Sequence, residues 1–350
     1  LTRALCEGFA LGVNAWLSAH AERAPAWAEG VGPAEVLALW HALLLLQAPF
    51  DLPGSYRPPP PFESGHAWAL SAARGRRGAP LLALAAHHHF EGPFRWYEAG
   101  LAVGDYAVHG LTFFGLPVIV QGVGAQHAWA LTPHQADTAD MEALRNVGPQ
   151  RDPGDPSLPG PIEQQAVALE LMANAETYFV RTANGLEERF VPVLIEPAGP
   201  VFEGRGGNLY IWRAAGYRRL GGLAQLFAMG AAESLEAFDA ALGQMQLPRF
   251  NVVYADRTNI AFRYLAHTGA RQFPEPRFNP ADAARARQTD WRQPVERWLA
   301  QAAWEQVVPL AHMPALTNPP AGIVQASGGP PWHATAAPPF DADDWPEWFS

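Results

Sequence analysis

The stretch Phe62-Glu63-Ser64-Gly65-His66-Ala67-Trp68-Ala69-Leu70 follows directly on the proline run 58–61, and it organises the chain. Residues 67–71 and 80–84 are apolar runs typical of strands. The arginine- and glycine-rich residues 74–78 between them predict a hairpin turn, because glycine tolerates the backbone angles that tight turns require. Ser64 therefore stands at the start of the first strand of a predicted sheet.

Further landmarks follow Ser64 in a fixed order. They are His87-His88-His89-Phe90, residues 94–101 around Trp96-Tyr97-Glu98, residues 110–118 containing Gly115-Leu116-Pro117, and His127-Ala128-Trp129-Ala130-Leu131-Thr132. This order resembles the penicillin amidase family of N-terminal-nucleophile hydrolases. In that family a β subunit begins with Ser-Asn, followed by Asn-Pro-His, Trp-Tyr-Glu-like, Pro-Gly-Leu-Pro and Ala-Trp-x-x-Thr segments. Four of these five landmarks are recognisable here.

Three other segments extend the resemblance over nearly the whole chain. Residues 9–17 resemble a helix of the family's α subunit, residues 249–264 resemble its Asn-x-x-Tyr-Ala-Asp hairpin, and residues 318–325 its Asn-Pro-Pro segment. We expect residues 1–63 to be the end of an α subunit or pro-segment, and residues 64–350 the first part of a catalytic β subunit. The precursor is expected to continue beyond both ends. The resemblance implies an α+β fold, a four-layer αββα sandwich of two mainly antiparallel sheets with the Ser64 strand central.

Local signals predict several other elements. Apolar residues at helical spacing indicate helices over 4–22 and over 34–46 behind Pro33, and Ser234 is a suitable N-cap for a helix over 234–242. Asn184-Gly185 predicts a hairpin between two alternating runs. The proline- and glycine-rich residues 145–161 predict an exposed loop.

Composition limits the classes of function. With 350 residues, 49% hydrophobic and 17% charged, the chain can bury one large core. A net charge of -10 without a basic block argues against nucleic acid or an anionic membrane surface as a partner. The single cysteine, Cys6, excludes an intramolecular disulfide and a thiolate zinc cluster. The longest apolar run, 42–46, is far shorter than the roughly 20 residues that span a bilayer, so we expect a soluble protein.

Ser64 is the predicted nucleophile, and the family resemblance implies that its base is its own α-amine, freed by autocatalytic cleavage of the Glu63–Ser64 bond. An α-amine with a pKa of about 7.7 to 8.0 is partly unprotonated near neutrality, so modest desolvation makes it a usable base. The alternative is a surface serine after a proline linker.

The resemblance assigns the groups around the nucleophile. Asn251 matches the side-chain oxyanion donor, with a strand-end capping residue as the alternative, and Arg271 matches an arginine that orients this site, with a surface arginine as the alternative. The second, backbone donor falls on Pro133, which has no N–H. The neighbouring His134 amide or a water would have to replace it. Two more departures from the family pattern are Gly65-His66 after the nucleophile and Ala85-Ala86 before His87.

Other polar residues suggest weaker assignments. His87 aligns with a family histidine, and the resemblance implies that it orients the Ser64 amine. Neighbouring side chains of a strand alternate between faces, so the histidine triplet offers one metal ion at most two ligands, His87 and His89. Asp137 and Asp140 match an Asp-x-x-Asp that binds structural calcium in some family members, and a solvated loop is equally compatible with this pattern. No cofactor is otherwise expected.

Aromatic residues are candidates for an acyl-binding pocket, with ordinary core positions as the alternative. They are Phe90, Phe113, Phe114 and Trp212.

The predicted activity is hydrolysis of a linear amide, such as a β-lactam side chain or an N-acyl-homoserine lactone, with the α and β segments associated after cleavage. The resemblance implies a periplasmic or secreted protein, although no signal peptide is visible. The alternative is a catalytically degenerate, unprocessed relative that acts as a small-molecule binding module, which Pro133 and Gly65 favour. A metal hydrolase built on the histidine triplet is a third, more distant hypothesis.

Overall fold

The computed structural model describes most of the chain, with several gaps. The described residues are 1–25, 28, 30–46, 65–76, 78–88, 91–144, 172–183, 185–203, 209–269, 271, 284, 287–291, 293–305 and 308–345. Ser64, His89, Phe90 and the predicted loop 145–161 lie outside the described residues.

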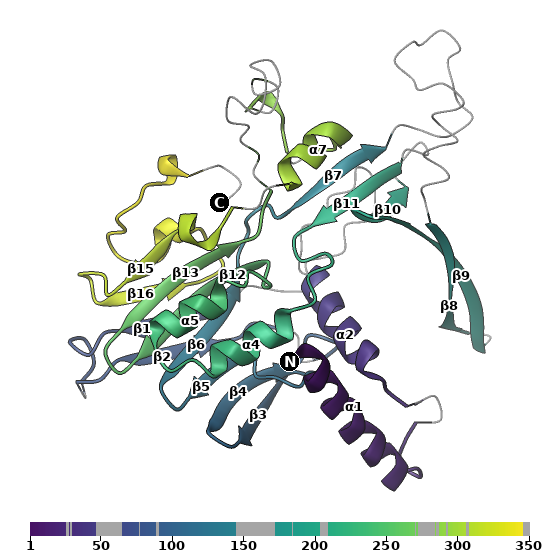
Figure 1. Ribbon diagram of the computed structural model, residues 1–350, viewed down its shortest axis with the longest axis horizontal. Helices are drawn as coiled ribbons and strands as arrows, with labels where there is room; N and C mark the ends of the chain where they lie inside the picture. The colour runs from purple at the N-terminus through teal and green to yellow at the C-terminus, as the bar shows by residue number, and fades with distance from the viewer. Residues whose placement is uncertain are drawn as a thin grey trace.

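A seven-stranded antiparallel sheet forms the centre of the molecule (Figure 1). Its order is β15 (Ala315–Thr317), β13 (Ile260–Ala266), β12 (Arg249–Asp256), β6 (His127–Pro133), β5 (Gln121–Gly124), β4 (Tyr106–Phe113) and β3 (Trp96–Val103). All residues of β13 are buried, as are six consecutive residues of β12. Strands buried on both faces require a covering layer on each side.

A three-stranded sheet covers one face of this central sheet. β1 (His66–Leu70) lies between β16 (Ile323–Ala326) and β2 (Leu81–Ala85), antiparallel to both. Ala67 and Ala69 are fully buried, and their small side chains let the two sheets approach closely. The hairpin predicted after Ser64 is therefore confirmed, with bounds shifted by one residue.

Helices cover the opposite face. On α5 (Leu235–Leu242), Phe238 packs against Tyr254 of β12, and on α4 (Gly222–Gly230) Phe227 stacks on Tyr106 of β4 at 4.4 Å. Ser234 caps α5 by accepting a hydrogen bond from the Ala237 N–H at 3.2 Å, as predicted.

The helix–sheet–sheet order gives three successive layers of the expected αββα sandwich. Two N-terminal helices, α1 (Thr2–Ala19) and α2 (Pro33–Leu45), pack on each other near α4, and both contribute buried residues to the core of the β-rich part. Among the described residues no helix is both long enough and apolar enough to cross a membrane.

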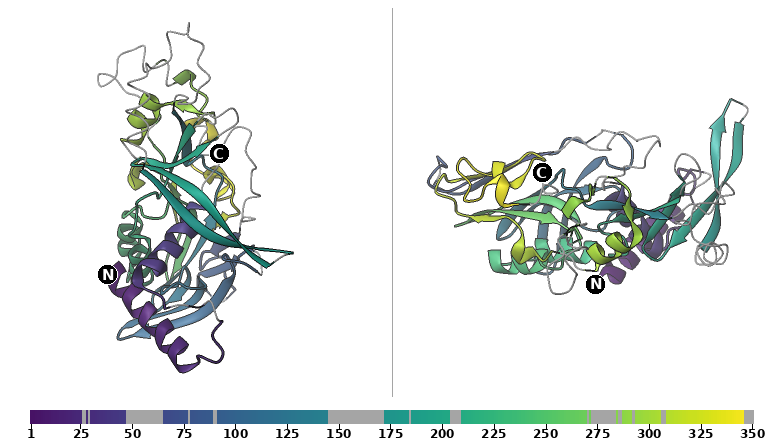
Figure 2. Two further views of the ribbon diagram at one scale, coloured as in Figure 1. Left: turned by 90° about the vertical axis from the view of Figure 1, so that its right-hand side faces the viewer. Right: turned by 90° about the horizontal axis from the view of Figure 1, so that it is seen from above.

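A six-stranded sheet extends from one end of the molecule, and its last two strands project as a hairpin (Figures 1 and 2). The order is β14 (Val295–Glu296), β7 (Ala139–Leu144), β11 (Leu209–Ala214), β10 (Gly199–Glu203), β9 (Gly185–Glu196) and β8 (Met172–Thr182). Gly185 takes a φ of 115° at the hairpin turn, which confirms the turn predicted at this position.

Short helices complete the described chain. They are α7 (Arg297–Trp304), η2 (Leu310–His312), η3 (Pro331–His333) and η4 (Ala342–Asp344).

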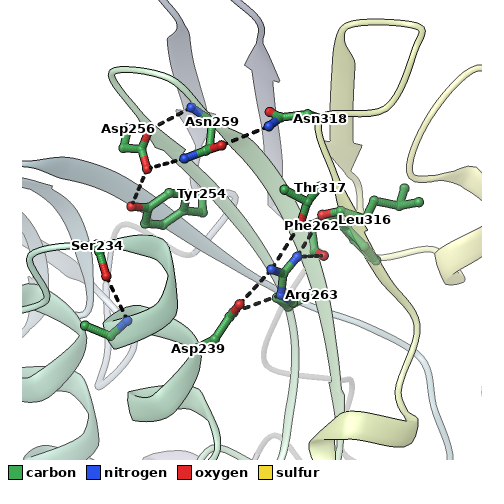
Figure 3. Close-up of polar contacts among 11 residues, drawn as sticks. Ser234, Asp239, Tyr254, Asp256, Asn259, Phe262, Arg263, Leu316, Thr317 and Asn318 are labelled. Carbon is green, nitrogen blue, oxygen red and sulfur yellow. Dashed lines mark hydrogen bonds and ion pairs between the residues drawn. The ribbon is translucent and has the colours of Figure 1, made fainter.

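Asp256 fixes the turn between β12 and β13 (Figure 3). One carboxylate oxygen accepts from the backbone N–H groups of Thr258 and Asn259, both at 2.7 Å, and the other accepts from the Tyr254 hydroxyl at 2.9 Å. The Asn318 side chain donates to that of Asn259 at 2.8 Å, which attaches the start of β13 to the segment after β15. Burial alone would raise the pKa of Asp256, but these donors outweigh it and lower that pKa to about 2.

Arg263 joins three elements across the same sheet (Figure 3). Its guanidinium donates to both carboxylate oxygens of Asp239 on α5 at 2.8 Å, and to the Leu316 carbonyl of β15 at 2.7 Å. A bidentate pair of this kind holds its partners in one orientation. The hairpin that carries Asn251 is therefore held by polar contacts both at its turn and at Arg263, which pairs with Val252 beside Asn251.

Candidate active site

Gly65, the first described residue after Ser64, lies beside β6, the strand that pairs with the Asn251 strand β12. Gly65 is buried, and a Cβ built on it would lie 3.7 Å from Thr132 Cγ2 and only 2.9 Å from the Ala85 carbonyl oxygen. Thr132 is in turn the β6 partner of Asn251 on β12. Glycine at position 65 is thus explained by the close approach of the β2 backbone, which a larger residue such as asparagine would disturb.

Asn251 is oriented by the segment after β16. Its side chain is 1% exposed, and its Nδ2 donates to the Gly329 carbonyl at 3.2 Å. A carboxamide nitrogen has two hydrogens, so one donor remains for a second acceptor. Its Oδ1 is buried without a hydrogen-bond partner among the described residues. The side chain is therefore held in place while part of its hydrogen-bonding capacity stays unused.

Pro133 ends β6, opposite Phe250 of β12. The next residue, His134, is fully buried: its Nε2 donates to the Leu265 carbonyl at 2.8 Å, and its Nδ1 accepts from the Ala136 N–H at 3.2 Å. Burial, helped by the nearby Arg249 charge, lowers the pKa of His134 to about 3. The ring is consequently a neutral structural group, and the backbone-donor role predicted near Pro133 stays a prediction.

His87 contacts the first residue of β1. Its Nε2 lies 3.2 Å from Nδ1 of His66, and the two rings meet edge to face with centroids 4.5 Å apart. His88 lies instead against Trp96 and Phe113. The two neighbouring histidines, which follow the end of β2, thus have different surroundings. Within the described residues no group of three or more His, Cys, Asp or Glu side chains could hold a metal ion.

Arg271 lies between the two predicted calcium ligands. Its guanidinium donates to Asp137 and to Asp140, both at 2.9 Å, while the second oxygen of Asp140 accepts from Trp304 Nε1 at 2.6 Å. Arg271 is 2% exposed and Asp140, on β7, is also 2% exposed. Two alternatives are therefore wrong: Arg271 is not a surface arginine, and Asp140 is not in a solvated loop.

The carboxylates in this arrangement do not fit a calcium site. Calcium takes six to eight oxygen ligands, whereas both oxygens of Asp140 are already hydrogen-bonded and Asp137 has one oxygen on the Arg271 guanidinium. Burial raises the pKa of Asp140 to about 6, against the lowering effect of Arg271. Calcium binding by Asp137 and Asp140 stays a prediction from the resemblance, and no step below depends on it.

A small apolar cavity lies on the helix side of the β6–β12 pair. Phe113 is buried there and stacks on Trp96 at 4.1 Å. The volume is about 10 Å³, near the smallest space that holds one water molecule, so an acyl group needs the walls to open. The lining residues are Trp40, His88, Trp96, Phe113, Val120, Leu131, Pro133 and Phe250.

The other predicted pocket residues lie elsewhere. Phe114 is 43% exposed, with the Arg95 guanidinium 4.1 Å from its ring centre. Trp212 packs in a separate cluster of the six-stranded sheet with Ala139 and Met141. Their assignment to an acyl pocket stays a prediction.

Most of the cavity residues were not predicted from the sequence, among them Trp40 and Phe250. Trp40 comes from α2, and no local pattern indicates that this helix reaches the cavity. Phe250 could have been predicted as a cavity residue from the sequence, because it directly precedes the candidate site residue Asn251 on the same strand.

Comparisons with known proteins identify relatives of this chain. A family model described as penicillin amidase matches residues 1–347. Two acyl-homoserine lactone acylases named QuiP, from Pseudomonas fluorescens strains Pf0-1 and Pf-5, are 24% identical over 207 residues and 25% identical over 202 residues. These alignments cover 57% and 56% of this chain, but only 24% and 23% of the relatives.

A thermostable penicillin G acylase from Alcaligenes faecalis has a similar solved structure. The TM-score is 0.53 at 18% sequence identity, over 79% of this chain and 45% of that one. This likeness supports the fold, and the chain spans about a quarter of the length of the curated relatives.

Proposed function

This chain belongs to the penicillin amidase family, and from that premise we propose that it hydrolyses linear amides with Ser64 as an N-terminal nucleophile. Autocatalytic cleavage of the Glu63–Ser64 bond would free the α-amine of Ser64. One residue then supplies both the nucleophile and its base.

The reaction follows the usual course of acyl transfer. The Ser64 hydroxyl attacks the amide carbonyl while its α-amine takes the proton, and Asn251 Nδ2 donates a hydrogen bond to the oxyanion that forms. Collapse of this intermediate transfers the proton to the leaving amine and leaves an ester on Ser64. Water, activated by the same amine, then releases the acid and regenerates the serine.

The observation that carries the proposal is the row formed by Gly65, Thr132 and Asn251. Gly65 directly follows Ser64 in the chain and packs against Thr132, which pairs with Asn251 across the two strands. The head of β1 and the unused donor of Asn251 therefore lie on the same face of the central sheet. This is the juxtaposition that an N-terminal nucleophile and a side-chain oxyanion donor require.

The finer parts of the proposal follow from the relatives. Proteins of this kind are named for acyl-homoserine lactones and penicillin G, so we propose acyl amides of small amines as substrates. The protein would act in the periplasm or outside the cell, need no cofactor for the chemistry, and keep its two segments associated after cleavage. The shared core of α1, α2 and the central sheet supports this association.

Hydrolysis of acyl 4-nitroanilides tests the activity, with Ser64→Ala and Ser64→Cys as variants. The parent protein should release nitroaniline and Ser64→Ala should release none. Ser64→Cys should form a covalent thioester that mass spectrometry detects, because a thiolate attacks the same carbonyl. Equal rates for the parent and Ser64→Ala would show that another group is the nucleophile.

A binding module without turnover is the second candidate. Two observations favour it: Pro133 has no N–H to offer an oxyanion, and Asn251 already donates to Gly329. In that case calorimetry would detect binding of an acyl amide, while the anilide stays intact and Ser64→Ala binds equally well.

A further inference from the structure

Arg249 begins the strand that carries Asn251. Side chains two apart on a strand point to the same face, so Arg249 and Asn251 share a face about 7 Å apart along β12. Across the sheet, Asn251 pairs with Tyr264 and Arg249 with Ala266. The charge of Arg249 acts on both His134 and Tyr264, which stack on each other at 4.1 Å.

Arg249 has no counter-ion in the described part of the chain. Neither a hydrogen bond nor an ion pair joins it to a described residue, and its Nε is buried without a partner there. Asp137, a carboxylate whose charge acts on Arg249, is bound to Arg271 instead. Burial lowers the pKa of Arg249 to about 10, so the guanidinium remains charged at neutral pH.

Three other partly or fully buried arginines of the described chain are, by contrast, paired. Arg213 with Glu142, Arg263 with Asp239 and Arg271 with Asp140 form charge-assisted hydrogen bonds. A partly buried cation without a partner is costly, and a bound anion would remove that cost. The position beside Asn251 makes the substrate the natural source of this anion.

We propose that Arg249 binds a carboxylate carried by the amine part of the substrate, so that the preferred substrates are N-acyl amino acids and related amides with an acid group close to the scissile nitrogen. This inference rests on the proposed function. An uncharged amine part, such as a lactone, would leave the guanidinium without a partner.

The two faces of the β6–β12 pair decide which part of the substrate carries the acid. The apolar cavity is lined by Phe250 and Pro133, which point away from the face of Asn251 and Arg249. An acyl chain held in this cavity therefore lies on the opposite face of the β6–β12 pair from Asn251 and Arg249, which leaves the amine part of the substrate for the face of the guanidinium. The leaving amine then extends along β12 toward the guanidinium.

Two matched chromogenic substrates test this assignment. Acyl derivatives of 5-amino-2-nitrobenzoate and of 4-nitroaniline share the acyl group and differ by one carboxylate on the amine part. For the parent we expect a KM at least about tenfold lower for the benzoate. Arg249→Gln should remove this difference in KM with kcat within about twofold, and Arg249→Lys should keep part of the difference. Arg189 is an exposed arginine on β9, so Arg189→Gln is the matched control.

A third substrate tests which part of the substrate must carry the carboxylate. Glutaryl 4-nitroanilide carries its carboxylate on the acyl part, and we expect Arg249→Gln to leave its KM unchanged. If Arg249→Gln raises the KM of the glutaryl substrate alone, or raises the KM of all three substrates equally, the assignment is overturned.

A binding measurement separates this inference from the proposed function. In Asn251→Ala, which keeps Ser64 and is expected to turn over slowly, calorimetry should give at least about tenfold tighter binding of the acylated benzoate than of the anilide, and adding Arg249→Gln should abolish the difference. Binding that is equal for both ligands would overturn the carboxylate site even in an active enzyme. A clear preference in a protein without turnover would keep the site and reject the hydrolase. Circular dichroism of each variant checks that it is folded.

Discussion

Replacing Arg271 by glutamine removes the counter-charge from two carboxylates at once. The side chains of Arg271 and Asp140 are 0% exposed, whereas that of Asp137 is 20% exposed. Removing one partner of a buried ion pair costs about 3 to 5 kcal/mol, because the other charge is left in a poorly solvated position. Trp304 still donates to Asp140 in the variant, so we expect the lower end of this range, about 3 kcal/mol.

Urea unfolding followed by tryptophan fluorescence measures the loss at pH 7. The pKa of Asp140, already raised to about 6, should rise further in Arg271→Gln. A raised folded-state pKa contributes stability that is complete below the unfolded pKa of about 3.9 and is lost as the pH rises through the folded value. The difference between variant and parent should therefore shrink as the pH falls from 7 to 5.

Controls separate the buried pair from general charge effects. Arg189→Gln breaks an exposed pair with Glu187 and should change the free energy of unfolding by less than about 1 kcal/mol. The double variant Arg271→Gln/Asp140→Asn should recover part of the loss, since it removes the fully buried charge of Asp140. A loss below about 1 kcal/mol in Arg271→Gln would refute this reasoning. A parent protein that is destabilised by a chelator would show that calcium, rather than Arg271, neutralises Asp137 and Asp140.

Three further variants test other parts of the account. Asn251→Ala should fold normally and lower kcat by about 10² to 10³, because an oxyanion donor is lost, and an unchanged rate on an acyl anilide would move the oxyanion site elsewhere. Pro133→Ala should raise kcat about tenfold if the proline removes a backbone donor, whereas a flat or lower rate would mean that a neighbouring amide such as His134 already serves. The pKa of Asp256 is lowered only in the folded state, so the parent gains stability as the pH rises through about 2 to 4, and Asp256→Asn should lack this gain. Parallel curves of unfolding free energy against pH for the two proteins between about pH 2 and 5 would contradict this.

Elements with local signals could be predicted from the sequence. The β1–β2 hairpin follows from two apolar runs around a glycine-rich turn, and the β8–β9 hairpin follows from Asn184-Gly185. The N-cap of α5 at Ser234 depends on residues three apart. In each case the interacting residues lie close together in the chain.

Features that depend on distant residues could not be predicted in this way. Asp140 belongs to a buried strand because Arg271, 131 positions away, neutralises it. Trp40 reaches the cavity through the packing of α2 beside the central sheet, for which its own helix gives no signal. The absence of a counter-ion for Arg249 among the described residues likewise becomes visible only when every neighbouring strand is in place.

The central claim is that Ser64 becomes a chain terminus and acts from there. Intact mass spectrometry of the purified full-length precursor and of its Ser64→Ala variant tests this claim directly. We expect two chains from the parent, one of which begins at Ser64, and one uncleaved chain from Ser64→Ala. A parent protein that remains one chain after prolonged incubation, with the mass of the unprocessed precursor, would contradict the account and favour the binding module.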